Sequence, residues 1–307
     1  MAVLAITGGT GFVGGHLLRM ARANGHEVRA LTRREQPAQA GVAWVKGALD
    51  RPESLAELVA GADAVIHVAG VINAPDRAGF AQGNITGTET LLAAVKAAGV
   101  RRFIHVSSLS AREPDLSAYG WSKLVSEQRV RLAAAAGGLD FTIVRPPAVY
   151  GPGDRETLEF FRMARHGFVL LPPGGRLSVI AAEDLCRLLI DLPNRPETIH
   201  QTYEPDDGIE GGWSHTDFAR AIGAAVGRPV RPIAVPMAVM RAAAFLDGLF
   251  RRAGAKLTPD RVRMYSHPDW VAGPHARPAP EIWQPRIDTR AGLVDAAAWY
   301  RAAGWLK

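Results

Sequence analysis

Lysine is scarce in this chain of 307 residues: five lysines, at positions 46, 96, 123, 256 and 307, stand against 31 arginines. The single cysteine, Cys186, excludes an internal disulfide framework and fits a reducing compartment. No run of about 18 uncharged apolar residues occurs, so we expect no transmembrane segment. Since the N-terminus also lacks a basic region and a cleavage signature, the expected location is the cytoplasm.

Cation clusters and metal-ligand patterns are lacking as well. The formal net charge of +6 and the pI near 9.8 favour anionic ligands. Because there is no dense Lys/Arg run and no nucleic-acid motif, a phosphate-bearing small molecule is a more economical partner than a nucleic acid. The nine histidines show no pair at metal-ligand spacing, so no metal site is expected.

The first half of the chain alternates apolar strand-like runs with helix-like segments. Strands are expected at 2–7, 26–32, 62–70, 102–108 and 140–146, and helices at 14–25, 54–61, 86–100 and 119–136. Continuous apolar strands separated by helices imply a parallel sheet covered on both faces. The expected fold class is α/β, a Rossmann-type doubly wound parallel sheet that binds its ligand at the carboxyl ends of the strands.

The second half predicts a smaller C-terminal substrate-binding lobe. "RLSVIAAEDLCRLLIDL" (176–192) has the pattern of one more strand and helix that return to the sheet. We therefore expect a dinucleotide-binding domain at 1–150, with 176–203 returning to it, and a lobe made of 151–175 and 204–307. Shorter helices are expected at 215–226 and 236–252, and the proline-rich stretch 273–287 is expected to be an extended loop.

One of these helices has two interpretations. "MAVMRAAAFLDGLFRRAG" (237–254) has apolar residues at helical spacing and basic residues at its end. Core packing is the favoured interpretation. The alternative is a peripheral contact with a lipid surface or with a partner.

"ITGGTGFVGGHLL" places glycines at 8, 11 and 14 directly after the first strand and at the start of the first helix. Gly8 can take the tight turn, Gly11 lets backbone N–H groups approach a pyrophosphate, and Gly14 allows close packing of helix on sheet. The position of these glycines, more than their spacing alone, predicts a dinucleotide site.

The end of the second strand predicts which dinucleotide is preferred. NAD-preferring sites usually have a carboxylate there, whereas this chain has Thr32 followed by Arg33 and Arg34. Two guanidiniums suit a 2′-phosphate, so NADP is the expected cofactor and NAD the alternative. The other interpretation is that both arginines are simply solvated, with Glu35 pairing with one of them.

"SAYGWSK" (117–123) combines one of the five tyrosines with one of the rare lysines. Positions i and i+4 of a helix share a face, so Tyr119 and Lys123 can point at one ligand. In a chain that nearly always uses arginine, this lysine indicates a need for a compact ammonium that can lose its proton.

The ordered motifs resemble those of the extended short-chain dehydrogenase/reductase superfamily, which includes the NAD-dependent epimerase/dehydratases. The matching segments are "TGGTGFVG" (7–14), "HVAG" (67–70), "NITGTETLLAA" (84–94), "HVSS" (105–108), "YGWSK" (119–123) and "RPPAVYGPGD" (145–154). They cover the first half of the chain, and the second half matches only loosely. The fold implied by this resemblance is the Rossmann-type sheet already expected.

The resemblance implies a role for each matching residue. The implied catalytic residues are Ser108, Tyr119 and Lys123, with Asn84 and Ser107 as supporting neighbours. The implied cofactor-binding residues are Gly8, Thr10, Gly11, Phe12, Val13, Arg33, Arg34, Leu49, Ala69, Gly70, Lys123, Pro146 and Val149. Tyr119 would exchange a proton with the substrate oxygen, Lys123 would favour its phenolate and bind the ribose, and Ser108 would donate a hydrogen bond to that oxygen.

Three departures from the family pattern narrow the implied reaction. Ala48 stands where many relatives have an acid that contacts adenine, and Ala148 stands where nucleotide-sugar enzymes tend to have asparagine. The connection from Ser108 to Tyr119 is also short. These departures favour hydride transfer between nicotinamide and a hydroxyl/carbonyl group of a small substrate that can be apolar, as in 3β-hydroxysteroid dehydrogenase or dihydroflavonol reductase relatives.

Two alternatives to this reaction stay open. One is a nucleotide-sugar epimerase or dehydratase that retains its cofactor. The other is a non-catalytic structural protein similar to the atypical relatives in respiratory complex I. The resemblance also implies that a homodimer can form through the helix that carries Tyr119.

Overall fold

A computed structural model describes residues 1–251 and 257–307, and in it the chain divides into two compact units. The first unit comprises Met1–Arg145 and Leu185–Tyr203, and the second comprises Pro146–Asp184 and Glu204–Lys307. The last residues of the expected helix 237–254, from 252 onward, lie outside the described part.

The first unit is built on a seven-stranded sheet in which every neighbouring pair is parallel. Its order is β11-β6-β5-β4-β1-β2-β3. The strands are β1 (Val3–Thr7), β2 (Glu27–Thr32), β3 (Val42–Lys46), β4 (Ala64–His67), β5 (Arg102–Val106), β6 (Asp140–Val144) and β11 (Gln201–Tyr203). Since β2 follows β1 on one side and β4 lies on the other, the direction of winding reverses between β1 and β4. Ligands bind at such a switch point in open α/β sheets.

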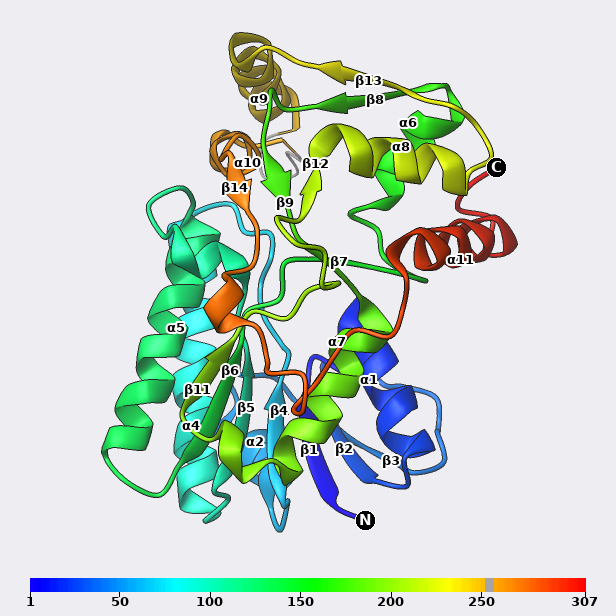
Figure 1. The fold of residues 1–307 in the computed structure, drawn as a ribbon. Helices are drawn as coiled ribbons and strands as arrows, with labels where there is room; N and C mark the ends of the chain where they lie inside the picture. The colour runs from blue at the N-terminus through cyan, green and yellow to red at the C-terminus, as the bar shows by residue number, and fades with distance from the viewer. Residues whose placement is uncertain (252–256) are drawn as a thin grey trace. The chain divides into compact units, whose positions relative to one another are not determined.

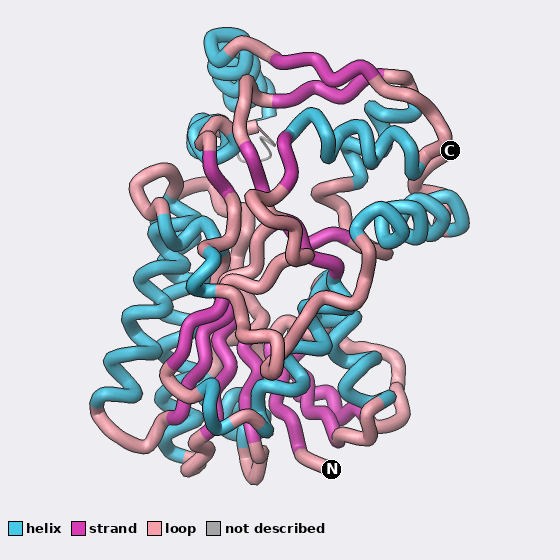
Figure 2. Tube along the Cα trace, in the orientation of Figure 1, coloured by secondary structure: helices cyan, strands magenta, loops and turns pink. Residues whose placement is uncertain are grey.

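Helices cover both faces of this sheet (Figures 1 and 2). The helices and helical turns of the first unit are α1 (Phe12–Ala23), α2 (Pro52–Val59), α3 (Arg77–Phe80), η1 (Ala81–Thr86), α4 (Gly87–Ala97), η2 (Leu109–Arg112), α5 (Ala118–Ala135), η3 (Leu192–Asn194) and η4 (Pro196–Thr198). Figure 1 shows α4 and α5 on one side of the sheet and α1 on the other. The core on the α4 side includes Leu55, Leu91, Phe103 and Ile143, all with no exposed surface. The doubly wound α/β fold predicted from the sequence is therefore confirmed.

The strand expected at 176–181 does not return to this sheet, so that prediction was wrong. Its residues form two short strands, β9 (Arg176–Leu177) and β10 (Val179–Ala181), which pair within the second unit. The edge of β6 is instead occupied by β11, which pairs with it from Gln201 to Tyr203. The expected helix is present as α7 (Ala182–Asp191), and its residues from Leu185 onward belong to the first unit.

The second unit contains short strand pairs and helices around a separate core. Its other elements are β7 (Ala148–Tyr150), α6 (Leu158–Arg165), β8 (Phe168–Leu171), β12 (Trp213–Ser214), α8 (His215–Ala225), β13 (Arg231–Ala234), α9 (Met237–Arg251), α10 (Pro259–Tyr265), β14 (Asp269–Trp270), η6 (Pro274–Ala276) and α11 (Thr289–Ala302). Tyr150, Phe161 and Tyr300 are the largest side chains fully buried in this core. The proline-rich stretch 273–287 has one short 3-10 turn and no strand, as expected for an extended loop.

A buried arginine ties the η3–η4 segment to the sheet of the first unit. One nitrogen of Arg102 donates to Leu192 O at 2.7 Å and to Thr198 Oγ1 at 2.8 Å. The same guanidinium donates to Asp140 O and Thr142 Oγ1, both at 2.9 Å. Burial lowers the pKa of Arg102 to about 10, and the charge stays on because these acceptors replace water.

We expect the Arg102→Met variant to lose about 2–4 kcal/mol of unfolding free energy, because the substitution leaves four hydrogen-bond acceptors without this donor. Urea denaturation of the purified chain measures this loss. The matched control is Arg101→Met: Arg101 is the adjacent arginine, its side chain is 69% exposed, and it makes a surface ion pair with Asp140. The denaturation midpoint should stay near wild type in the control, and equal losses in both variants would contradict the role of the buried network.

Candidate active site

The turn between β1 and α1 has the backbone geometry that a dinucleotide site needs. Gly8 adopts a φ of +78°, and its carbonyl accepts a hydrogen bond of 3.0 Å from Gly11 N. A Cβ on Gly14 would overlap the carbonyl of Gly8, so only glycine lets α1 begin this close to the turn. Gly11 caps α1 without a side-chain hydrogen bond, and no acid lies in the first helical turn. The N–H groups at this end of the helix are thus suited to a pyrophosphate.

The same turn is in backbone contact with the segment after β4. A Cβ on Gly8 would lie 2.7 Å from Ala69 N, and Thr7 Oγ1 accepts a hydrogen bond of 3.2 Å from that nitrogen. Thr7 Oγ1 also lies 2.7 Å from His67 Nδ1, and His67 Nε2 lies 3.0 Å from Thr88 Oγ1. The ends of β1 and β4 are therefore held together at the switch point, where Ala69 was expected to line the cofactor.

His67 and its neighbour His105 belong to the core of the first unit. Burial, followed by the nearby charge of Lys123, lowers the pKa of His67 to about 3 and that of His105 well below its usual range. His105 Nε2 lies 3.0 Å from Ser126 Oγ. Two neutral, hydrogen-bonded imidazoles in the core have a structural role.

Asn84 connects the segment after β4 to helix α5. It lies in η1, a π-helical segment, and its side chain is buried. Its Oδ1 accepts a hydrogen bond of 2.6 Å from Val71 N, and its Nδ2 donates to Val71 O at 3.0 Å and to Ser122 Oγ at 2.9 Å. Because π-helical bulges are frequent at functional sites, this bulge agrees with the supporting role predicted for Asn84.

Ser108 and Tyr119 are brought together at the start of α5. Their side chains are hydrogen-bonded, and both are half-buried. Ser117 caps α5, with its Oγ accepting a bond of 3.0 Å from Gly120 N. A Cβ on Gly120 would lie 2.6 Å from Ser110 O, so this glycine allows the helix to approach the turn that follows Ser108. Sequence reasoning missed Gly120, although its place inside the conspicuous "YGWSK" segment was the available signal.

Lys123 lies on α5 one turn after Tyr119 and is buried. Its Nζ donates to Val106 O at 2.8 Å, at the end of β5. A Cβ on Gly70 would be 3.6 Å from this nitrogen, which places Lys123 beside the segment after β4. Burial lowers the pKa of Lys123 to about 8, and the charge of Glu127 opposes that shift.

Burial is the main influence on the pKa of Tyr119 in this structure. Burial raises it above its usual value, and the hydrogen bond from Ser108 opposes this rise. The Lys123 ammonium, one helical turn further on, donates to the carbonyl of Val106 in this structure. The phenol is therefore protonated at neutral pH in this structure, which is the form that can donate a proton.

Ser107, adjacent to Ser108, faces a different set of partners. Its Oγ donates to Glu127 Oε1 at 2.5 Å. Glu127 also forms an ion pair of 2.7 Å with Arg145, and its side chain is 1% exposed. Ser107 thus belongs to a buried charged network under α5, whereas Ser108 is the serine bonded to Tyr119.

The remaining residues of the expected cofactor set lie around the same edge of the first unit or in the second unit. Arg33 and Arg34 are exposed after β2, where Thr32 Oγ1 donates to Arg34 O at 2.6 Å. Thr10, Phe12 and Val13 form the turn and first residues of α1, and Leu49 packs against Gly87. Pro146 and Val149 belong to the second unit, and their approach to a nicotinamide stays a prediction.

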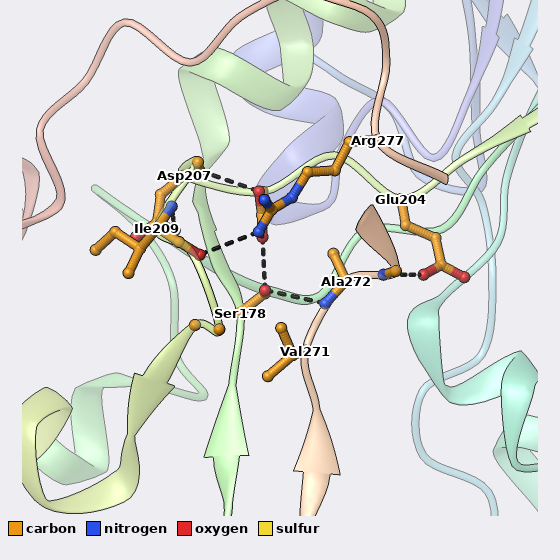
Figure 3. Close-up of polar contacts among 12 residues, drawn as sticks. Ser178, Glu204, Asp207, Ile209, Val271, Ala272 and Arg277 are labelled. Carbon is orange, nitrogen blue, oxygen red and sulfur yellow. Dashed lines mark hydrogen bonds and ion pairs between the residues drawn. The ribbon is translucent and has the colours of Figure 1, made fainter. Parts of the chain in front are cut away.

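The residues of a polar cluster in the second unit are hydrogen-bonded to one another (Figure 3). Arg277 donates to Asp206 Oδ2 at 2.7 Å and to Ile209 O at 3.0 Å. Ser178 Oγ donates to the same carboxylate at 2.6 Å and accepts from Ala272 N at 3.0 Å. These bonds hold the 272–277 loop in place. Across residues 1–251 and 257–307, no group of three or more His, Cys, Asp or Glu side chains could hold a metal ion.

The chain is similar to several known proteins over most of its length. The model of the NAD dependent epimerase/dehydratase family matches residues 4–168. A ceramide reductase from Caulobacter vibrioides is 37% identical, over 99% of this chain and 96% of its own length. A sterol demethylase protein B from Methylococcus capsulatus is 30% identical, over 98% of this chain and 99% of its own length.

Solved structures extend the comparison to the fold. The UDP-glucose 4-epimerase of Thermus thermophilus, solved in complex with NAD, has a TM-score of 0.73 and 19% sequence identity. The match covers 99% of this chain and all of that one. At this identity the likeness concerns the fold alone, which both chains share from end to end.

We expect Gly14→Ala to weaken dinucleotide binding by at least about tenfold and to lower the unfolding free energy by about 1–3 kcal/mol, since the added methyl group collides with backbone. Isothermal titration with the cofactor and urea denaturation measure the two effects.

Gly15→Ala is the matched control for this experiment. Gly15 is the next residue of the same helix, and a Cβ there would meet no atom within 4 Å. The substitution should leave stability unchanged or raise it by about 0.5–1 kcal/mol, as for any open helical glycine. A Gly14→Ala variant as stable as the Gly15→Ala variant would disprove the close approach of α1 to the turn.

Proposed function

This chain belongs to the NAD-dependent epimerase/dehydratase family, and we propose that within it the chain is an NADP-dependent reductase of a lipid carbonyl group. It is an NAD(P)-dependent oxidoreductase, as expected of a chain so similar to a reductase over its whole length. The observation that carries the proposal is the hydrogen-bonded pair Ser108 and Tyr119, with Lys123 one helical turn further on.

The proposed reaction turns a carbonyl group into an alcohol. When bound, the nicotinamide supplies the hydride that the carbonyl carbon receives. Tyr119 donates its phenolic proton to the carbonyl oxygen. The raised pKa of Tyr119 keeps the phenol protonated before this step. Ser108 donates a hydrogen bond to the same oxygen and stabilises the charge that develops there. Lys123 places positive charge beside the segment after β4 and favours the phenolate that Tyr119 leaves behind.

The residues present fit a dinucleotide in the first unit. Gly8, Gly11 and Gly14 form a turn whose close backbone contacts leave N–H groups at the start of α1, which supports pyrophosphate binding. Ala69 and Gly70 border this turn. The two exposed guanidiniums of Arg33 and Arg34 support a preference for a 2′-phosphate and hence for NADP.

A lipid is the substrate class that the relatives favour. The two whole-length relatives are named a ceramide reductase and a sterol demethylase protein B. Each name refers to a largely apolar molecule, a ceramide or a sterol. The nucleotide-sugar alternative has less support, because Ala148 replaces the asparagine expected of those enzymes and the epimerase likeness concerns the fold alone. We therefore assign the hydroxyl/carbonyl pair of an apolar substrate to this site.

Tyr119→Phe should lower kcat by about 10²–10⁴-fold while cofactor affinity stays within about twofold of wild type, since only the proton donor is removed. NADPH oxidation followed by absorbance, with a panel of long-chain ketones, measures the rate. Full activity in this variant would refute the role of Tyr119. A tightly retained cofactor without net NADPH turnover in the wild type would instead favour an epimerase.

The adjacent serines provide the control for this assignment. Ser108→Ala should lower kcat by about 10–10³-fold with little change in stability, because it removes a donor to the reacting oxygen. Ser107→Ala should instead lower the denaturation midpoint, because Ser107 is bonded to the buried Glu127. The opposite pattern would show that the two roles are exchanged.

Arg33→Asp should weaken NADPH binding by about 10–100-fold and leave NADH binding nearly unchanged, because the 2′-phosphate loses a charged partner and meets a carboxylate. Fluorescence titration with both dinucleotides measures the change. Arg195→Asp is the control, since the side chain of Arg195 is 39% exposed in the same unit and pairs with Glu197. Unchanged NADPH affinity in Arg33→Asp would rule out this explanation of cofactor preference.

A further inference from the structure

Helix α9 of the second unit exposes its apolar side chains to solvent. The exposed side chains include two phenylalanines, Phe245 at 71% and Phe250 at 81%. Together with Val239, Leu246 and Leu249, which are 49–62% exposed, they make up what we term the α9 face. Contiguous exposed apolar surface of this kind marks an interaction site in soluble proteins.

The α9 face lies opposite the side by which the helix is anchored. At about 100° per residue, its five side chains fall within an arc of about 140°. The side chains that are less exposed, Met237, Met240, Ala244 and Asp247, lie on the other side of the helix. Among the residues that the structure describes, Ser266 Oγ donates to Met237 Sδ, and Asp247 accepts a bond of 2.8 Å from Leu257 N. One side of the helix is thus bonded to the rest of the second unit, and the opposite side is exposed to solvent.

One exposed cation borders the α9 face. Arg241 is exposed and borders the arc, whereas the acid of the helix, Asp247, is on the anchored side. An apolar face bordered by an exposed arginine is the pattern of a helix that lies in the interface of an anionic membrane.

The two-stranded sheet that leads into α9 adds to the apolar surface. Strand β13 ends two residues before α9, and its Ile233 is the register partner of Leu170 on β8. Both side chains are exposed, at 40% and 43%. Figure 1 shows the chain passing from β13 directly into α9. The described residues contain no helix long and apolar enough to cross a bilayer, so α9 would lie on a membrane and not span it.

We propose that the α9 face inserts into the surface of an anionic lipid membrane and gives the enzyme access to a substrate dissolved there. This inference rests on the proposed function for the choice of a lipid substrate. The occupant is a lipid surface because the face combines phenylalanine and leucine with bordering arginine, so that apolar burial and attraction to anionic headgroups act together. The sequence favours core packing for the helix at 237–254. That interpretation is wrong for residues 237–250, because Ala244 is the single buried residue in this range.

Vesicle flotation with the full chain tests the membrane contact. Wild type should bind vesicles of phosphatidylcholine with phosphatidylglycerol at least about tenfold more tightly than vesicles of phosphatidylcholine alone, and added salt should weaken this binding. Leu249→Asp should reduce binding by at least about tenfold, since a carboxylate enters the apolar face. Arg241→Glu should reduce the preference for anionic vesicles. Absence of wild-type binding to anionic vesicles would overturn the proposal.

Leu132→Asp is the matched control. Leu132 is also a leucine on a helix and is 59% exposed, against 62% for Leu249, but it lies on α5 of the first unit. The Leu132→Asp variant should bind vesicles as tightly as wild type. Equal losses of binding in Leu132→Asp and Leu249→Asp would show a general effect of added negative charge. Thermal melting of both variants confirms that they are folded.

Light scattering on the same samples tests the competing occupant. If Leu249→Asp converts a dimer into monomers and wild type does not bind vesicles, a second copy of the chain covers the α9 face and the proposal fails.

A kinetic comparison separates this proposal from the proposed function. Leu249→Asp should lower kcat/KM for a long-chain ketone carried in anionic vesicles by at least about fivefold and leave kcat/KM for a short water-soluble ketone unchanged. If wild type binds the vesicles but reduces neither ketone, the proposed function fails and the membrane contact stands. If Leu249→Asp and wild type reduce each of the two ketones with equal kcat/KM, the membrane contact fails and the proposed function stands.

Discussion

Backbone-to-backbone contact at the switch point of the sheet is the constraint on which the rest of the site depends. The turn after β1 touches the segment after β4 so closely that a Cβ on Gly8 would meet Ala69, and α1 begins so close to the turn that a Cβ on Gly14 would overlap Gly8. These contacts fix where a pyrophosphate can approach the start of α1. They also fix where Gly70 stands relative to Lys123, and thereby relate the cofactor edge to the catalytic helix.

Helix α5, which carries Tyr119, buries mostly polar side chains against the sheet. Glu127 on α5 is nearly inaccessible, and it accepts from Ser107 and pairs with Arg145. Lys123 on the same helix is bonded to the end of β5, and Ser122 is bonded to Asn84. Buried groups of this kind are costly unless each is paired, so the pairing specifies one position for α5 against the sheet. In this position of α5, Tyr119 is hydrogen-bonded to Ser108.

The second unit shows a different balance of forces. Its core buries large aromatic side chains such as Tyr150, Phe161 and Tyr300, and its loop at 272–277 is held by Asp206 and Ser178. Helix α9 departs from this pattern, because it leaves phenylalanine and leucine in contact with water. Such a face raises the free energy of the isolated chain, and a lipid surface would relieve that cost by burying it.

Much of the fold and of the candidate site could be predicted from the sequence. The glycines at 8, 11 and 14 are local signals, because each acts within a few residues of the turn, and the spacing of Tyr119 and Lys123 follows from the pitch of one helix. The alternation of apolar strands with helices likewise predicted the doubly wound sheet, since burial on both faces leaves its pattern in each strand.

Only the tertiary structure decided the remaining features, because they depend on residues far apart in the chain. The stretch at 176–181 has a strand pattern, but its pairing partners lie at 148–150, 213–214 and 269–270, so it joined the second unit. The partner of Ser107 is Glu127 on α5, which no local pattern around Ser107 indicates. The apolar spacing of 237–250 determined a helix, whereas its exposure was decided by the neighbours it lacks on one side. Periodicity reports which residues share a face, but burial of that face requires a partner that the local sequence does not encode.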